Sequence, residues 1–373
     1  MDLIEHEGKK ILNRFGICVP RGTLVSRGED AKEAVRSVGL PVVLKAQVPA
    51  GGRGKAGGVQ IATDLQDAKQ KVENILGLSI GGFSPMGVLA EELIPVRKEF
   101  YFALTVDREV AAPIMLFGTI GGIDIEAAAG GSISRTMIDI DKGITFTDID
   151  EIWNRVERRT GREELERFLL AAWDAFWNMD CQLLEINPLF EVDGHLIAGD
   201  AKLSIDDDAL FRHPDLGSSG IPRGTDFEMA CRQVKLTGVE LGGDIAVVAN
   251  GAGLTMAVLD EISDAGLSGS CFLDMGGTDD PAIVETAVRL ASDKNLLHGL
   301  EGTFICMFGG ITRCDVVAQG IINAVKEKPL DVPLVVRMRG VNEIEGREML
   351  RAEGIEAHLD IGESIQAIKR MVG

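Results

Sequence analysis

The sequence is short of basic residues and of long apolar runs, and both shortages limit the partners that it can have. Lys and Arg number 38 against 58 Asp and Glu, and the formal net charge is −20. This balance argues against nucleic acid as a partner, because phosphate backbones are bound through a basic surface. A nucleotide needs only a local positive pocket and is not excluded. No run of 18 apolar residues is present, so we expect no transmembrane helix and no membrane partner.

Targeting signals and cysteine motifs are also missing. The first ten residues, MDLIEHEGKK, lack the apolar stretch of a secretory signal peptide, so we expect none. The six cysteines form no C-x-x-C pair and have no histidine cluster beside them, so we expect reduced, buried thiols in a cytoplasmic protein. None of the five histidines lies in a glycine loop at a strand end. The chain therefore offers no convincing residue for a phosphohistidine.

The length allows two domains, and the sequence pattern changes between the two halves. Residues 213–226, HPDLGSSGIPRGTD, are rich in Gly, Ser and Pro, and we predict the interdomain linker there. We therefore expect a first domain at 1–225 and a second domain at 226–373.

The first domain alternates between helical and strand periodicity. We predict helices at 3–15, 29–38, 64–76 and 162–179, and strands at 41–48, 58–63, 86–93, 99–107 and 111–118. This mixture predicts an α+β domain.

The second domain repeats a strand followed by a helix five times. Such a series predicts a doubly wound parallel sheet with helices on both faces, whose ligands bind beyond the carboxyl ends of the strands. Two glycine loops fall at those ends, NGAGL from Asn250 and FGGIT, which contains Gly310, Ile311 and Thr312. Each loop alone is a weak signal, but two at one sheet edge, each opening a helix, favour an anionic ligand.

The stretch AGGRGKAGG, residues 50–58, resembles two phosphate-binding motifs and matches neither. A P-loop would need glycine at Pro49 and a hydroxyl at Ala56. The dinucleotide fingerprint must open a helix, whereas a second strand follows here. The pattern predicts a hairpin with a basic glycine tip that covers phosphates, where Arg53 and Lys55 supply charge. The alternative is a mobile surface hairpin with two solvated bases.

Residues 181–203 predict a second hairpin, with Asp193-Gly194 as its two-residue turn. The turn fixes the register, so that Asn187 faces Asp200 and Glu185 faces Lys202. We expect Pro188 to mark an edge strand or a bulge. Oxygen ligands of this kind suit Mg²⁺, although a solvated polar face is the alternative. Together with the basic glycine hairpin they predict a site for a Mg-nucleotide.

Five segments, in order, resemble the β subunit of succinate–CoA ligase (ADP- or GDP-forming) over nearly the whole chain. They are KAQVPAGGRGKAGG, EINPL, DDALFRHPDL, NGAGL and FGGITRCD. The resemblance implies an ATP-grasp domain followed by a flavodoxin-like domain. It also implies a reversible reaction in which ATP or GTP, CoA and a dicarboxylate give acyl-CoA, nucleoside diphosphate and phosphate. A phosphohistidine on a partner α subunit carries the phosphoryl group, in an αβ or (αβ)2 assembly.

The same resemblance implies roles for individual residues. Those expected to contact the nucleotide are Lys45, Gly52, Arg53, Gly54, Glu91, Ile94 (through its backbone) and Glu99. Asn187 and Asp200 would bind Mg²⁺, and Glu185 would position the partner's histidine. The residues expected near the substrate and the phosphohistidine are Asn250, Gly310, Ile311 and Thr312.

Other functions remain open at this stage. The segment AKLSIDDDALFR also resembles the β subunit of malate–CoA ligase. Pro49, Ile120 and the linker depart from the family pattern, which affects the acid substrate more than the nucleotide. A stand-alone ATP-grasp ligase would leave the loops of the second domain unused. A nucleotide-sensing regulatory subunit predicts eroded metal ligands, whereas Asn187 and Asp200 are both present.

Overall fold

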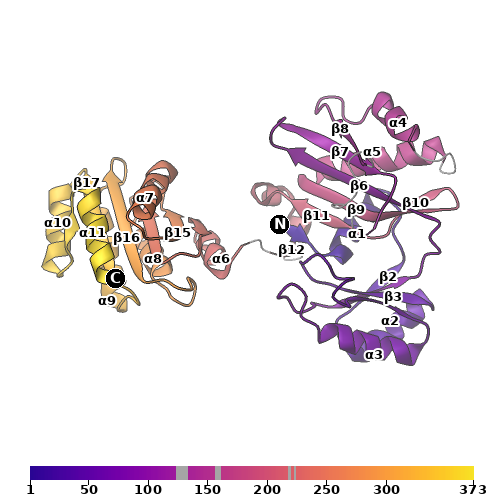
Figure 1. Ribbon diagram of the computed structural model, residues 1–373, viewed down its shortest axis with the longest axis horizontal. Coiled ribbons are helices and arrows are strands. Elements are labelled where there is room, and N and C mark those ends of the chain that lie inside the picture. Colours follow the sequence, from indigo (N-terminus) through magenta and orange to yellow (C-terminus); the bar gives the residue numbers. More distant parts are fainter. Residues whose placement is uncertain (123–132, 156–160, 217–219, 222–223) are drawn as a thin grey trace. The chain divides into compact units, whose positions relative to one another are not determined.

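The computed structural model describes residues 1–373 apart from 123–132, 156–160, 217–219 and 222–223. The chain divides into two compact units, Met1–Pro222 and Arg223–Gly373 (Figure 1). None of the helices in the described parts combines the length and the apolar character that a membrane span requires.

The first unit is built on a large, mainly antiparallel sheet. Its path runs through β12 (Gly220–Ile221), β1 (Asp2–Leu3), β11 (Lys202–Ile205), β9 (Cys181–Val192), β6 (Lys98–Asp107), β7 (Ala112–Gly118) and β8 (Ile133–Met137), and β10 (His195–Ala198) also pairs with β9. Helices α1 (Glu5–Arg14), α4 (Phe146–Trp153) and α5 (Arg162–Asn178) contribute to its core, in which apolar residues of the helices meet those of β6 and β9.

A smaller antiparallel sheet forms the rest of the first unit. Its order is β2 (Gly22–Val25), β5 (Val88–Glu92), β3 (Val42–Ala46) and β4 (Val59–Ala62). Helices α2 (Ala31–Val38) and α3 (Leu65–Leu76) share a separate core with it. β3 and β4 are antiparallel neighbours, with Lys45 opposite Val59. The predicted arrangement of strand, glycine loop and strand is therefore confirmed.

The predicted hairpin register is also confirmed. His195 pairs with Val192 across a turn whose two residues, Asp193 and Gly194, both have positive φ. Lys202 pairs with Glu185 in the same register. Pro188, however, does not lie on an edge strand, because β9 is internal to the sheet. The alternative expectation of an irregularity holds, since the pairing of β9 with β6 shifts register between Phe100 and Phe102.

The second unit contains the predicted doubly wound sheet. The strands are β13 (Thr237–Glu240), β14 (Ile245–Ala249), β15 (Gly269–Asp274), β16 (Gly302–Gly309), β17 (Leu334–Gly340) and β18 (Ala357–His358), in the order β13-β15-β14-β16-β17-β18. The last five along the chain are parallel to their neighbours. Their order is the flavodoxin-like one. β13 is an antiparallel addition that the sequence did not predict, because four half-exposed residues give no apolar run.

Helices cover both faces of this sheet, as predicted. α7 (Ala252–Asp264) and α11 (Ile361–Val372) share one core with it. The other face packs against α6 (Asp226–Gln233), α8 (Pro281–Ala291), α9 (Cys314–Glu327) and α10 (Glu343–Ala352). The two cores use alternate residues of each strand, for example Val247 and Val248 of β14.

The boundary between the two units falls inside the predicted linker at 213–226, but the first residues of that segment pack against the first unit. His213 is buried, and its Nε2 lies 2.7 Å from the Asp180 carboxylate. Residues 220–221 form β12, which pairs with β1. Residues 217–219 and 222–223 of the predicted linker lie outside the described residues. The Gly, Ser and Pro content did not distinguish a linker from a segment that packs against its own unit.

The cysteines follow the expectation with one exception. All six are free, and five are buried. Burial raises the pKa of the Cys181 thiol to about 12 and that of Cys231 to about 11. Cys18 is exposed, so the expectation of buried thiols is wrong at this position.

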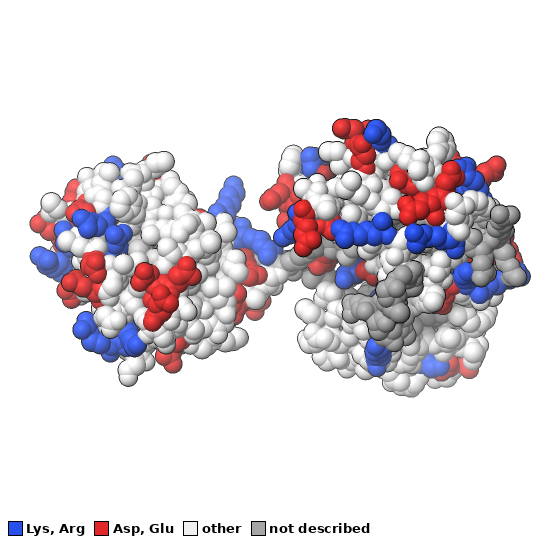
Figure 2. Space-filling model, turned by 45° about the horizontal axis from the view of Figure 1, so that its top comes forward, with Lys and Arg blue, Asp and Glu red and all other residues white. Residues whose placement is uncertain are grey.

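Charged side chains of both signs are spread over the surface. On the face drawn in Figure 2, acidic and basic residues are interspersed on both units, and a short row of basic side chains crosses the first unit. On this face the negative charge is therefore not gathered in one place.

Candidate functional site

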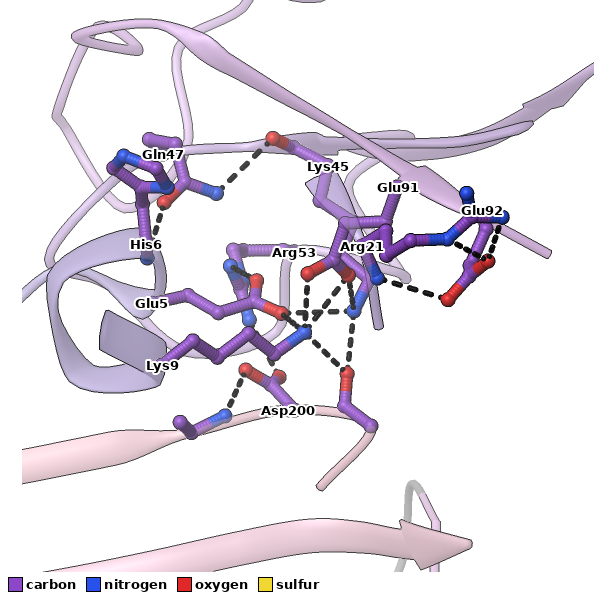
Figure 3. A network of polar contacts seen from close by, with 12 residues as sticks. Glu5, His6, Lys9, Arg21, Lys45, Gln47, Arg53, Glu91, Glu92 and Asp200 are labelled. Carbon is purple, nitrogen blue, oxygen red and sulfur yellow. Dashed lines mark hydrogen bonds and ion pairs between the residues drawn. The ribbon is translucent and has the colours of Figure 1, made fainter. Parts of the chain in front are cut away.

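Six charged side chains converge between the two sheets of the first unit, and two of them, Glu5 and Lys9, were not predicted. Figure 3 shows Glu5 and Lys9 from α1, Lys45 from β3, Arg53 from the glycine loop, Glu91 from β5 and Asp200 from the segment between β10 and β11. Three of these groups are cationic and three are anionic, so their charges balance.

Glu5 lies at the centre of this cluster. Its Oε1 is 2.8 Å from both the Lys45 Nζ and the Lys9 Nζ, and its Oε2 accepts from the Arg53 Nη1 at 2.6 Å. The Glu5 side chain is 1% exposed. A carboxylate so deeply buried needs cationic partners to stay ionised.

Lys9 holds two further groups in place. Its Nζ lies 2.7 Å from both carboxylate oxygens of Glu91 and donates to the Gly199 carbonyl at 2.8 Å. The Lys45 Nζ also donates to the Gly199 carbonyl, at 2.6 Å, and lies 2.9 Å from Glu91. Two lysines and two acceptors thus connect the small sheet to the large one.

The pKa shifts agree with this geometry. Burial raises the pKa of Glu5, but the charges of Lys45, Lys9 and Arg53 outweigh it and hold that pKa well below 4.5. Burial lowers the pKa of Lys45, and the charges of Glu5, Glu91 and Asp200 more than reverse this, so the net shift is upward. The pKa of Arg53 is raised in the same way, against its burial, by Asp200 and Glu5. These shifts keep Glu5, Lys45 and Arg53 ionised at neutral pH.

The glycine loop closes on itself next to these residues. The Gly58 N–H donates to the Arg53 carbonyl at 2.8 Å, and the Ala56 N–H to the Gly52 carbonyl at 3.2 Å. Gly52 has a φ of 74°, a conformation that glycine adopts without strain. Gly52 and Gly54 are exposed, whereas the Arg53 side chain, 14% exposed, turns inward to Glu5 and Asp200. The solvated alternative is therefore wrong for Arg53.

Asn187 and Asp200 lie opposite each other at the break between β10 and β11. Ala198 pairs with Leu189 before the break and Lys202 with Glu185 after it, in one register. The Asp200 Oδ2 is 2.5 Å from the Arg53 Nη2, and the Asn187 Oδ1 accepts from the Gly122 N–H at 2.9 Å. The amide oxygen of Asn187 and the carboxylate of Asp200, which already attracts a cation, fit Mg²⁺, because this ion takes few protein ligands beside substrate phosphates.

No larger metal site competes with this one in the part of the chain that the structure describes, where no three His, Cys, Asp or Glu side chains converge for a metal ion. A magnesium ion at Asp200 would therefore draw its remaining ligands from substrate and water.

The other predicted residues of the first unit lie on β5, β6 and β9 or directly after them. The Glu99 carbonyl accepts from the Gly121 N–H at 2.9 Å, and Ile94 is half-buried just after β5. Glu185 lies on β9 between Ala103 of β6 and Lys202 of β11. The Glu91 carboxylate, in contrast, is enclosed with Lys9 and Lys45 and faces the interior.

Sequence reasoning missed Glu5, Lys9 and Gly199. Glu5 and Lys9 are spaced four residues apart and share the buried side of α1 with Leu12. The available signal was the spacing, because a charged pair on the same face of a helix as its apolar residues is expected to be buried. Gly199 carries no such signal, because its role depends on its carbonyl.

Gly199→Ala is expected to destabilise the first unit by about 1–3 kcal/mol, the usual cost of overpacking. A Cβ at this position would lie 2.4 Å from the Phe190 ring, so the carbonyl that both lysines share has to move. Thermal denaturation measures the loss. Gly77→Ala is the control, because its Cβ would meet its nearest atom at 3.5 Å. Equal melting temperatures for the two variants would contradict this account.

In the second unit, the predicted loops meet where the strand order reverses. Asn250 follows β14, and Gly310, Ile311 and Thr312 follow β16, its neighbour in the sheet. The Asn250 side chain joins the loops, since its Oδ1 accepts from the Phe308 N–H at 3.0 Å and its Nδ2 donates to the Phe308 carbonyl at 2.9 Å. Ligands of such sheets bind at this reversal point.

The residues of the FGGIT loop differ in their exposure and in their hydrogen bonds. Ile311 is 83% exposed, whereas Thr312 is buried and its Oγ1 has no hydrogen-bond partner among the described residues. The N–H of Cys314, at the start of α9, is already taken by the Val341 carbonyl at 2.9 Å. Asp274, which was not predicted, accepts from the N–H groups of Gly251 and Gly276 at 2.6 and 2.7 Å and so fixes the adjoining loops.

Comparison with known proteins gives the same two parts in the same order. A family model of the ATP-grasp domain matches residues 2–191, and one described as CoA-ligase matches residues 248–367. The GDP-forming succinate–CoA ligase subunit beta of Thermus thermophilus is 37% identical over 378 residues, covering 100% of this chain and 99% of that protein. The ADP-forming subunit beta of Methanocaldococcus jannaschii is 39% identical over 365 residues, which is 95% of each.

A solved structure supports the fold. ATP citrate lyase from Methanothrix soehngenii, in complex with citrate and coenzyme A, matches with a TM-score of 0.76 over 99% of both chains. Its sequence identity is 19%, so this likeness concerns the fold alone. The full-length identity to the ligase subunits decides the family, and this chain belongs to the β subunits of succinate–CoA ligase.

Proposed function

We propose that this chain is the nucleotide-binding β subunit of a succinate–CoA ligase. It couples the hydrolysis of ATP or GTP to the formation of succinyl-CoA from succinate and CoA, reversibly and through a phosphohistidine on a partner α subunit. The observation that carries the proposal is the convergence of Lys45, Arg53 and Asp200 beside the glycine loop of an ATP-grasp domain. Such a site combines cations for phosphates with an oxygen ligand for a metal.

The phosphates bind at the glycine loop. Lys45 and Arg53 neutralise their charge, and the exposed glycines Gly52 and Gly54 let backbone N–H groups approach the phosphate oxygens. Asp200 and Asn187 would hold Mg²⁺, which would supply neutralisation of the charge that develops on the transferred phosphoryl group. The short contact of Asp200 with a guanidinium supports this assignment, because the carboxylate already favours a cation.

The base and ribose bind along Glu91, Ile94 and Glu99. Ile94 offers its backbone, and Glu99 offers a carboxylate at the start of β6. The Glu91 carboxylate is occupied by Lys9 and Lys45, so its side chain serves the site by orienting Lys45. One relative named as GDP-forming and one named as ADP-forming are each 37% identical to this chain, so the binding test includes both nucleotides.

The partner contributes the histidine that carries the phosphoryl group. Glu185, which lies on the same strand as Asn187, orients that histidine at the nucleotide site. Asn250, Gly310, Ile311 and Thr312 serve the second site, where the histidine meets the acid and CoA. The exposed position of Ile311 supports a contact with something outside this unit.

The isolated chain is expected to bind Mg-ATP or Mg-GTP and to have no acid–CoA ligase activity. Activity should appear on mixing with an α-type subunit, because the phosphohistidine belongs to that subunit. Measuring thioester formation with succinate and malate side by side identifies the acid, and the mass of the active complex distinguishes αβ from (αβ)2. Full activity of the chain alone would contradict the proposal.

A further inference from the structure

We propose that Glu5 is a positioning residue of the nucleotide site, which holds Lys45 and Arg53 together so that both can meet the phosphates. This inference rests on the proposed nucleotide site. Glu5 is the first residue of α1, a helix whose apolar residues belong to the core of the large sheet. Lys45 and Arg53 belong to the small sheet and its glycine loop. Glu5 therefore reaches from one sheet to the cations of the other (Figure 3).

Each carboxylate oxygen of Glu5 contacts a different cation of the small sheet and its glycine loop. Oε1 lies 2.8 Å from the Lys45 Nζ, and Oε2 is 2.6 Å from the Arg53 Nη1. Lysine and arginine side chains have many rotamers, and ordering them on binding weakens affinity. A single buried carboxylate that contacts both fixes their positions before the nucleotide arrives.

Like charges would otherwise drive these groups apart. Lys9 and Lys45 each lie 2.8 Å from the same oxygen of Glu5, so their ammonium groups are close neighbours. Arg53 adds a third positive charge on the other oxygen. Without the carboxylate, repulsion in a poorly solvated site favours arrangements in which the cations separate. Glu5 is thus what allows Lys45 and Arg53 to converge.

The exposure of its two carboxylate partners shows which of them Arg53 can exchange for a phosphate. The Asp200 side chain is 31% exposed, whereas Glu5 is 1% exposed. A metal–nucleotide can reach Asp200 and displace the Arg53 Nη2, while the Nη1 stays on Glu5. Glu5 therefore keeps Arg53 in place when Asp200 passes to the metal.

The test is titration calorimetry of the full chain with Mg-ATP and Mg-GTP. Glu5→Gln is expected to raise the dissociation constant of the bound nucleotide about tenfold, and Glu5→Asp, which keeps the charge, by less. Arg53→Ala is expected to have a similar tenfold effect. Because Glu5 acts through Arg53, the effects of the two substitutions should not multiply. The dissociation constant of the variant that carries both should rise clearly less than about 100-fold. An additive result, or an unchanged or lower dissociation constant for Glu5→Gln, would overturn the inference.

Two further variants separate positioning from stability. Glu5→Gln with Lys9→Met removes one charge of each sign, keeps the cluster balanced and should still bind nucleotide about tenfold more weakly. Wild-type affinity in this folded variant would also overturn the inference. Glu164→Gln is the control, because Glu164 lies outside the site, where it accepts a hydrogen bond from the Leu196 N–H at 3.0 Å. The nucleotide affinity of this variant should match that of the wild type. If the wild-type chain itself binds neither nucleotide, the proposed function fails, whereas nucleotide binding that Glu5→Gln leaves intact removes only the role of Glu5.

Discussion

Asp200→Ala is expected to lower the rate of phosphorylation of the partner's histidine at least about 100-fold. Substitutions of groups that only support metal ligands cost about 10–100-fold in metal affinity or activity, so the loss of a ligand should cost at least as much. The change also leaves the Arg53 Nη2 without its carboxylate at 2.5 Å. Rapid-quench measurement with labelled ATP and excess partner subunit gives the rate.

Asp215→Ala is the matched control for this experiment. Asp215 also forms an ion pair with an arginine, at 2.7 Å from the Arg14 Nη1, and it lies in the same unit but outside the cluster. Its phosphorylation rate should equal that of the wild type. A rate for Asp200→Ala within a few-fold of the control would remove Asp200 from the metal site.

Lys9→Met is expected to lower the free energy of unfolding of the first unit by about 3–5 kcal/mol, the cost of removing one partner from a buried ion pair. Lys9 is 5% exposed and contacts Glu5 and Glu91, which are 1% and 3% exposed. Without Lys9, both carboxylates depend on Lys45 alone for a lysine partner. For a unit of this size, the melting temperature should fall by about 6–20 °C.

Lys142→Met provides the comparison for an exposed lysine. Lys142 pairs with Asp139 at 2.8 Å on the surface of the same unit, where salt bridges contribute little. Differential scanning calorimetry should show no measurable change for this variant. If Lys9→Met melts at the same temperature as Lys142→Met, the cluster does not hold the two sheets together.

The sequence predicted the local parts of the site because short-range rules determine them. The Asp193-Gly194 turn fixes the register of its hairpin, so the pairing of Glu185 with Lys202 follows without further information. The strand that follows the glycine stretch excluded the dinucleotide fingerprint, and Pro49 and Ala56 excluded a P-loop. In the second unit, the regular alternation of strands and helices was sufficient to place Asn250 and Thr312 at one sheet edge.

The connections between distant segments could not be predicted in the same way. Lys9 and Glu91 are 82 residues apart, and Lys9 and Gly199 are 190 apart. Nothing local indicates that the small sheet packs over α1 and buries Glu5. On an isolated helix, a Glu–Lys pair spaced by four residues is an ordinary surface feature.

The predicted linker began too early for a related reason, although it contains the boundary between the units. Composition suggested an exposed segment at 213–226. His213 is instead buried against Asp180, which precedes it by 33 residues in the sequence. Short strands such as β12 and β13 also escaped, because their pairing depends on neighbours that are remote in sequence.

Transfer of label from γ-labelled nucleotide tests the central claim most directly. The chain, its partner α subunit and their mixture are each incubated with Mg-ATP or Mg-GTP, and the acid-labile label on each polypeptide is counted. The account predicts label on the partner subunit only when this chain is present, and none on this chain. Label on a histidine of this chain, or on the partner subunit without it, would contradict the account.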